Sequence, residues 1–194
     1  GGLPVRNLAQ YADGAWECFV DRAGQEGLSG QVEAMTTWNG GLAIGGGFWS
    51  AGANTVKGVS WWNGEEWQPL GPPNAPGMDG TVRALVAWRG DLIAAGSFTT
   101  AGGQLVNRIA RWDGTAWQAL ASGGQVGMDK TVRALAVWNG LLVAGGDFLT
   151  AGGESVSRIA TWDGVSWQPL RATWSVGTDG TVRALAVHDG ALVG

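Results

Sequence analysis

The chain has 194 residues, of which 35 are glycine, 13 are tryptophan and 45% are hydrophobic. Collagen and disorder are excluded, because glycine has no three-residue period, only 6 residues are proline, and the tryptophans supply a large area for burial. The net charge of −4 argues against a nucleic-acid or anionic-membrane surface, and the single cysteine, Cys18, excludes an internal disulfide framework.

The chain repeats itself with a period of 50 residues. The pentapeptide Thr-Val-Arg-Ala-Leu begins at Thr81, Thr131 and Thr181, and a diverged copy begins at Gln31. Aromatic residues follow the same period, in columns that begin at Trp38, Phe48, Trp62 and Trp67. A fixed period of this length indicates one supersecondary unit that is stacked repeatedly.

The first half of each unit predicts a β-hairpin. Small and apolar residues alternate over Val82–Trp88, and a second short apolar run covers 91–96 after Arg89-Gly90. Asn39-Gly40 and Asn139-Gly140 occupy the same turn in other copies. Asn-Gly pairs adopt the positive φ angles that a type I′ hairpin turn requires.

The second half of each unit predicts another hairpin, which follows a glycine-rich loop. Its strands are expected over 106–112 and 115–120, around the turn at Asp113-Gly114. No stretch shows a sustained helical period with caps, so we expect almost no helix. Each unit is therefore predicted to be four short antiparallel strands.

Units of this kind are typical of β-propeller blades, which surround a central axis and leave only short sheet edges. The predicted fold is an all-β propeller with four blades in one domain. Three blades cover 31–80, 81–130 and 131–180, and a split blade combines 181–194 with 1–30. We expect six tryptophans to be largely buried between blades: Trp62, Trp67, Trp112, Trp117, Trp162 and Trp167.

One unit resembles a kelch-type blade. The resemblance lies in Leu142-Val-Ala-Gly-Gly, in Arg158-Ile-Ala-Thr-Trp-Asp-Gly and in Trp167-Gln-Pro-Leu. The tryptophans of a pair are closer together than in kelch repeats, and a Phe-x-Thr-Ala-Gly-Gly segment follows the double glycine. The chain is more similar to tryptophan-rich, secreted bacterial propeller repeats, which implies an extracytoplasmic or secreted location and leaves the activity open.

The two ends of the chain each carry half a blade. Residues 5–19 predict a third-and-fourth-strand hairpin, and residues 181–193 predict a first-and-second-strand hairpin. An isolated hairpin is only marginally stable, so pairing is expected. The pairing either closes a four-bladed ring within one chain, which we favour because both ends are tethered, or joins two chains in a larger ring by exchange.

The sequence offers few groups for catalysis. His188 replaces a tryptophan of the first hairpin, and Cys18 has no histidine in its own repeat, so we interpret both as structural residues. The repeated aspartates, such as Asp113, stand in turns and lack the spacing of a calcium loop or of a glycosidase carboxylate pair. We therefore predict no catalytic residue, no metal site and no cofactor.

One column of charged residues is a candidate binding site. Arg83, Arg133 and Arg183 share a column with Glu33 on the first strand of each unit, which is innermost in a kelch-like blade. The four side chains are candidates to line an axial channel and hold an anion. The structural alternative pairs each arginine with an aspartate four residues upstream: Asp79, Asp129 and Asp179.

Tryptophans that depart from the repeat are better guides to function, because a binding site need not follow the symmetry. Trp49, Trp61 and Trp174 lie outside the shared columns, and Trp49 and Trp174 stand in loops. Aromatic residues on loops over a rigid scaffold are common platforms for ligands such as sugar rings.

The preferred interpretation is a non-catalytic binding or scaffold module that holds a carbohydrate or a protein by its rim loops or axial channel. Nucleic acid is not expected as a partner. The longest uncharged stretch, 34–56, is interrupted by glycines and polar residues, so no membrane span is predicted. The alternatives are a structural unit that assembles with other copies through its split blade, and an enzyme such as a kelch-like oxidase or a glycan-cleaving propeller.

Overall fold

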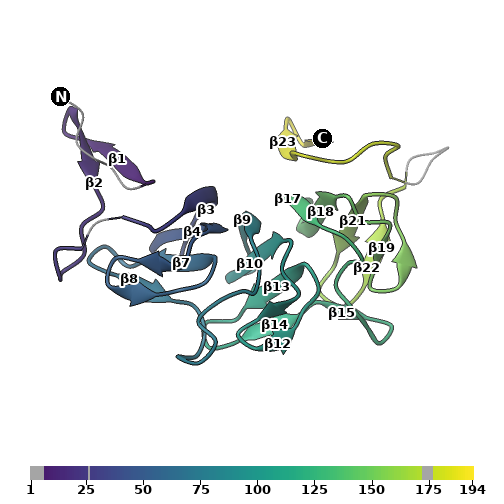
Figure 1. Cartoon of the computed structure of the whole chain (residues 1–194). Helices are drawn as coiled ribbons and strands as arrows, with labels where there is room; N and C mark the ends of the chain where they lie inside the picture. The colour runs from purple at the N-terminus through teal and green to yellow at the C-terminus, as the bar shows by residue number, and fades with distance from the viewer. Residues whose placement is uncertain (1–6, 26, 172–176) are drawn as a thin grey trace.

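The computed structural model describes residues 7–25, 27–171 and 177–194. Within these ranges the chain is all-β, and the three repeat units form antiparallel four-stranded sheets arranged in an arc (Figure 1). The prediction of an all-β chain built from repeated four-stranded units is confirmed. The described residues contain no helix that could span a membrane.

Each sheet has its strands in chain order, from the first strand of the unit to the fourth. The first sheet consists of β3 (Gln31–Trp38), β4 (Gly41–Gly47), β7 (Val59–Trp62) and β8 (Trp67–Pro69). The second sheet consists of β9 (Val82–Trp88), β10 (Asp91–Gly96), β13 (Ile109–Trp112) and β14 (Trp117–Ala119). The third sheet consists of β17 (Val132–Trp138), β18 (Leu141–Gly146), β21 (Ile159–Trp162) and β22 (Trp167–Pro169).

The loops contain four short hairpins. Three of them follow the second strand of a unit, and the fourth follows β14. They are β5 (Ser50–Ala51) with β6 (Asn54–Thr55), β11 (Thr100–Ala101) with β12 (Gln104–Leu105), β19 (Thr150–Ala151) with β20 (Glu154–Ser155), and β15 (Ala121–Ser122) with β16 (Gln125–Val126).

The turns between first and second strands have the predicted backbone. Asn39 and Asn139 have φ angles of 48° and 49°, and glycines with positive φ follow them. Arg89 adopts the same conformation, with a φ of 53°, although arginine rarely does so. All three sheets therefore share the turn geometry, but the first residue of the turn is asparagine in the first and third sheets and arginine in the second.

The tryptophan columns form much of the core between neighbouring sheets. Trp67, Trp117 and Trp167 are at most 2% exposed, and Trp112 and Trp162 are also buried. Burial is thus confirmed for five of the six tryptophans that we expected in the core. Trp62, in the first sheet, is half-buried instead.

Indole N–H groups connect each sheet to the next. At the end of the first strands, Trp38 Nε1 donates to the carbonyl of Gly90 at 2.8 Å, and Trp88 Nε1 donates to the carbonyl of Gly140 at 3.0 Å. Because the acceptor is a backbone carbonyl of the following sheet, these bonds set how neighbouring sheets sit.

A second set of indole bonds points backward along the chain. Trp117 Nε1 donates to the carbonyl of Leu70 at 2.9 Å, and Trp167 Nε1 donates to that of Leu120 at 3.1 Å. Trp67, in the same column, is fully buried but has no partner for its Nε1 among the described residues. Among the described residues, the first sheet therefore lacks an indole bond that the other two sheets have.

The end hairpins lie apart from each other, at opposite ends of the arc in Figure 1. Within the described part of the chain, β1 (Ala9–Ala12) pairs with β2 (Ala15–Cys18) alone, and β23 (Ala186–His188) pairs with β24 (Ala191–Val193) alone. Among the described residues no closed four-bladed ring is identified, and the two halves of the expected split blade do not pair with each other. Each of the three complete sheets nevertheless has all four of its strands hydrogen-bonded.

Candidate functional site

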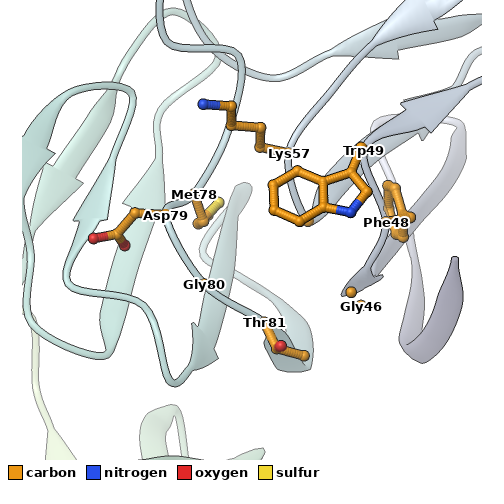
Figure 2. A pocket seen from close by; sticks show the side chains of 10 residues that line it. Gly46, Phe48, Trp49, Lys57, Met78, Asp79, Gly80 and Thr81 are labelled. Atoms are coloured by element: carbon orange, nitrogen blue, oxygen red, sulfur yellow. The ribbon is translucent and has the colours of Figure 1, made fainter. Parts of the chain in front are cut away.

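The first candidate site is a hollow of about 210 Å³ between the first and second sheets, beside the loop that follows β4 (Figure 2). In Figure 2 the Trp49 ring lies next to Lys57, and Asp79 lies on the far side of Met78. Four glycines, Gly46, Gly47, Gly58 and Gly80, also line the hollow. A Cβ on Gly47 would meet only Thr81 Oγ1, 3.8 Å away, so this position leaves open space in the hollow.

The loop holds Trp49 outward while its neighbour anchors the chain. Phe48 is 1% exposed, whereas Trp49 is 69% exposed. The backbone N–H of Trp49 donates to Ser29 Oγ at 2.8 Å. The equivalent positions in the other sheets are Thr99 and Leu149. The exposed indole is therefore a feature of the first sheet alone among the three.

Asp79, on the far side of the hollow, organises the neighbouring loop. Its carboxylate accepts hydrogen bonds from the N–H groups of Thr99 and Thr100 and from the Thr99 hydroxyl. Burial raises the pKa of Asp79, but these donors outweigh that effect and hold the pKa below its ordinary value. Asp129 accepts the N–H groups of Leu149 and Thr150 in the same way.

The arginine column is paired, but with carboxylates other than those we expected. Arg83 Nη1 lies 2.7 Å from Glu33 Oε2, on the first strand of the preceding sheet. Arg133 binds Asp147, the residue directly after β18, with its Nε 3.0 Å from Oδ1 and 2.9 Å from Oδ2. The predicted pairing of these two arginines with Asp79 and Asp129 is therefore wrong.

The first strands do lie on the inner side of the arc, where β9 contacts both β3 and β17. The hydrogen bonds from Arg133 hold the pKa of Asp147 below its ordinary value, against the opposing effect of burial. Arg183, which is exposed, adds a smaller electrostatic effect of the same sign on Asp147. Arg83 and Arg133, on the inner strands, are thus each paired with a carboxylate, Glu33 and Asp147 respectively.

The remaining residues that the sequence singled out are not brought together. His188 Nε2 lies 3.4 Å from Asp189 Oδ2, and both side chains are more than 80% exposed. Cys18 is half-buried and unpaired in a disulfide. Trp174 lies outside the described residues. Within the described ranges, no group of three or more His, Cys, Asp or Glu side chains is placed to hold a metal ion.

Sequence reasoning missed a second pocket, of about 430 Å³, at the opposite end of the same sheet junction. Its lining includes Trp38, Trp61, Asn63, Gln68 and Asp113. The turn of each hairpin and the loop after its second strand lie at opposite ends of a sheet, so this pocket is separate from the Trp49 hollow. The available signal was Trp61, which stands outside the repeated columns.

The sequence matches no protein-family model, and no curated protein matches it as a relative.

Proposed function

We propose that this protein is a non-catalytic binding module that holds a sugar ring of a glycan against Trp49. The observation that carries the proposal is the 69% exposed indole of Trp49 at the edge of a glycine-lined hollow. An exposed aromatic ring on a loop over a rigid sheet is a common ligand platform.

The chemistry of the hollow supports a sugar. The electron-rich face of an indole attracts the weakly positive C–H groups on one face of a pyranose ring. Lys57 is exposed and provides an ammonium donor for hydroxyl groups, while its backbone is held by Pro76 and Met78. The hollow thus combines one apolar platform with a polar rim, which is the usual arrangement of a small-ligand site.

The scaffold that we infer is a β-propeller, with the three sheets as blades. The inward position of the first strands and the indole bonds between sheets support this arrangement. The extracytoplasmic location follows only from the resemblance to secreted repeats and belongs to the same proposal.

A glycan array tests the proposed function with two matched variants. Trp49→Thr introduces the residue that the second sheet carries at this position, and Leu149→Thr makes the same change in the third sheet. We expect the natural protein and Leu149→Thr to bind the same glycans, and Trp49→Thr to bind them about 10-fold more weakly or worse. Binding of no glycan above background, or equal binding by Trp49→Thr, would refute the proposal.

A further inference from the structure

The second pocket differs from its counterpart one repeat further along the chain. Asn39 lines the pocket between the first and second sheets, and Arg89 occupies the equivalent turn position 50 residues later. The Arg89 guanidinium carbon lies 4.4 Å from the centre of the Trp88 ring, a cation–π contact. Its Nη1 lies 2.7 Å from the point that a Cβ on Gly164 would occupy. Arg89 therefore reaches across to the third sheet.

The corresponding place in the first junction is open. Asn39 is too short to span the distance, and a Cβ on Gly114, the counterpart of Gly164, would meet no atom within 4 Å. Trp38, the counterpart of Trp88, forms one wall. At the junction of the second and third sheets, the Arg89 guanidinium fills this place. At the junction of the first and second sheets, the same place is open.

The walls of the open pocket are aromatic. Trp61 packs edge-to-face against Trp38, with ring centres 5.9 Å apart, and its Nε1 donates to the Trp38 carbonyl at 3.0 Å. The second sheet has Arg111 in place of Trp61. The open pocket therefore has a second, rigidly held indole where its counterpart has a cation.

The polar lining is rich in acceptors and contains no lysine or arginine. Asp113 is exposed, and the N–H groups of Ala116 and Thr115 hold its pKa below the ordinary value, so it is an anion at neutral pH. Gln68 donates its amide to Glu66, which leaves its carbonyl oxygen as an acceptor. Electron-rich rings and a carboxylate together favour a cation.

We propose that this pocket binds the guanidinium group of an arginine side chain from a polypeptide partner. Arg89 shows within the same chain that a guanidinium fits against this tryptophan column. A planar guanidinium stacks on an indole and presents several N–H donors to carboxylate and amide oxygens, whereas an ammonium group is compact and strongly hydrated. The pocket volume of about 430 Å³ lies in the range of small-ligand sites, about 300–1,000 Å³.

The inference is independent of the Trp49 hollow, because the two sites share no lining residue. It is tested by titrating the full chain with N-acetylargininamide while recording the indole N–H resonances of Trp38 and Trp61. N-acetylcitrullinamide, a neutral molecule of the same shape, and N-acetyllysinamide serve as comparison ligands. We expect saturable shifts with the arginine derivative, and binding at least about 5-fold weaker with the other two.

Two variants place the binding at this pocket. Asn39→Arg fills the pocket from the same turn position at which Arg89 already adopts the required backbone, with a φ of 53° against 48° for Asn39. Asn139→Arg adds the same charge to the third sheet at a φ of 49° and serves as its matched control. We expect Asn39→Arg to abolish the shifts and Asn139→Arg to retain them.

A second pair of variants tests the charge without filling the pocket. Asp113→Asn keeps the turn, because Asn63 already accepts the N–H groups of Glu65 and Glu66 in the first sheet with its Oδ1. Asp163→Asn is the control in the third sheet. We expect binding of the arginine derivative to weaken about 3-fold or more in Asp113→Asn only. Equal binding of the citrulline derivative, or binding that survives in Asn39→Arg, would overturn the proposal.

Discussion

Replacing Trp67 by phenylalanine is expected to destabilise the protein less than the same change at Trp117 or Trp167. All three indoles are at most 2% exposed, so each substitution leaves a similar cavity. Trp117 and Trp167 lose a hydrogen bond to a carbonyl of the preceding sheet. Trp67 loses a buried N–H that has no partner among the described residues.

The size of the difference follows from the hydrogen-bond terms. A typical hydrogen bond contributes about 0.5–1.5 kcal/mol net, and a buried unsatisfied donor costs about 1–3 kcal/mol. Trp117→Phe loses the contribution of a hydrogen bond, whereas Trp67→Phe removes the cost of an unsatisfied buried donor. The cavity that the smaller ring leaves destabilises both variants by a similar amount. The free energies of unfolding of the two variants should therefore differ by about 1.5–4.5 kcal/mol, with Trp67→Phe the more stable.

Urea unfolding, followed by near-ultraviolet circular dichroism, measures this difference. With a slope of about 2 kcal/mol per molar urea, the midpoints of Trp67→Phe and Trp117→Phe should differ by about 1–2 M. Trp167→Phe is the replicate and should behave like Trp117→Phe. If Trp67→Phe lowers the midpoint as much as the other two, the assignment of an unpartnered indole in the first sheet is incorrect.

Two further predictions concern backbone packing and acid stability. A Cβ on Gly46 would overlap the carbonyl of Gln31, so Gly46→Ala should unfold the first sheet in thermal melts. A Cβ on Gly47 would lie 3.8 Å from Thr81 Oγ1, so Gly47→Ala should change the free energy of unfolding by at most about 1 kcal/mol. Because the pKa of Asp79 is lower in the folded state, its contribution to stability is complete above its ordinary pKa of 3.8 and is lost as the pH falls below it. Between neutral and acid pH, the urea midpoint of Asp79→Asn should therefore fall less than that of the natural protein. An equal fall would contradict the stabilising role of the hydrogen bonds from Thr99 and Thr100 to the Asp79 carboxylate.

Local patterns in the sequence were sufficient for the first hairpin of each unit. The strands expected over Val82–Trp88 and 91–96 have the same bounds in the structure. Alternation places the apolar side chains, and the Asn-Gly or Arg-Gly pair closes the turn with positive φ angles. These interactions act between near neighbours, so they are visible in the sequence.

The second hairpin is shorter than the sequence predicted. Positive φ angles at Asn107 and Arg108 keep residues before Ile109 out of the strand. On the other side, the Asp113 side chain accepts the N–H groups of Thr115 and Ala116 and holds them in a turn. Side-chain bonds to the backbone compete with strand pairing, and a pattern of apolar residues does not reveal that competition.

The repeat, the strand alternation and the turns follow from local sequence patterns, but the pairing of charged side chains does not. Arg83 has Glu33 beside it on the preceding sheet, but Arg133 has Arg83 there and binds Asp147 instead. Asn39 likewise leaves open a pocket that its counterpart fills. The contacts between sheets, such as Arg83 with Glu33 and Trp38 with Gly90, join residues about one repeat apart. They depend on how neighbouring sheets are placed, and many weak packing and hydrogen-bond interactions together determine that placement.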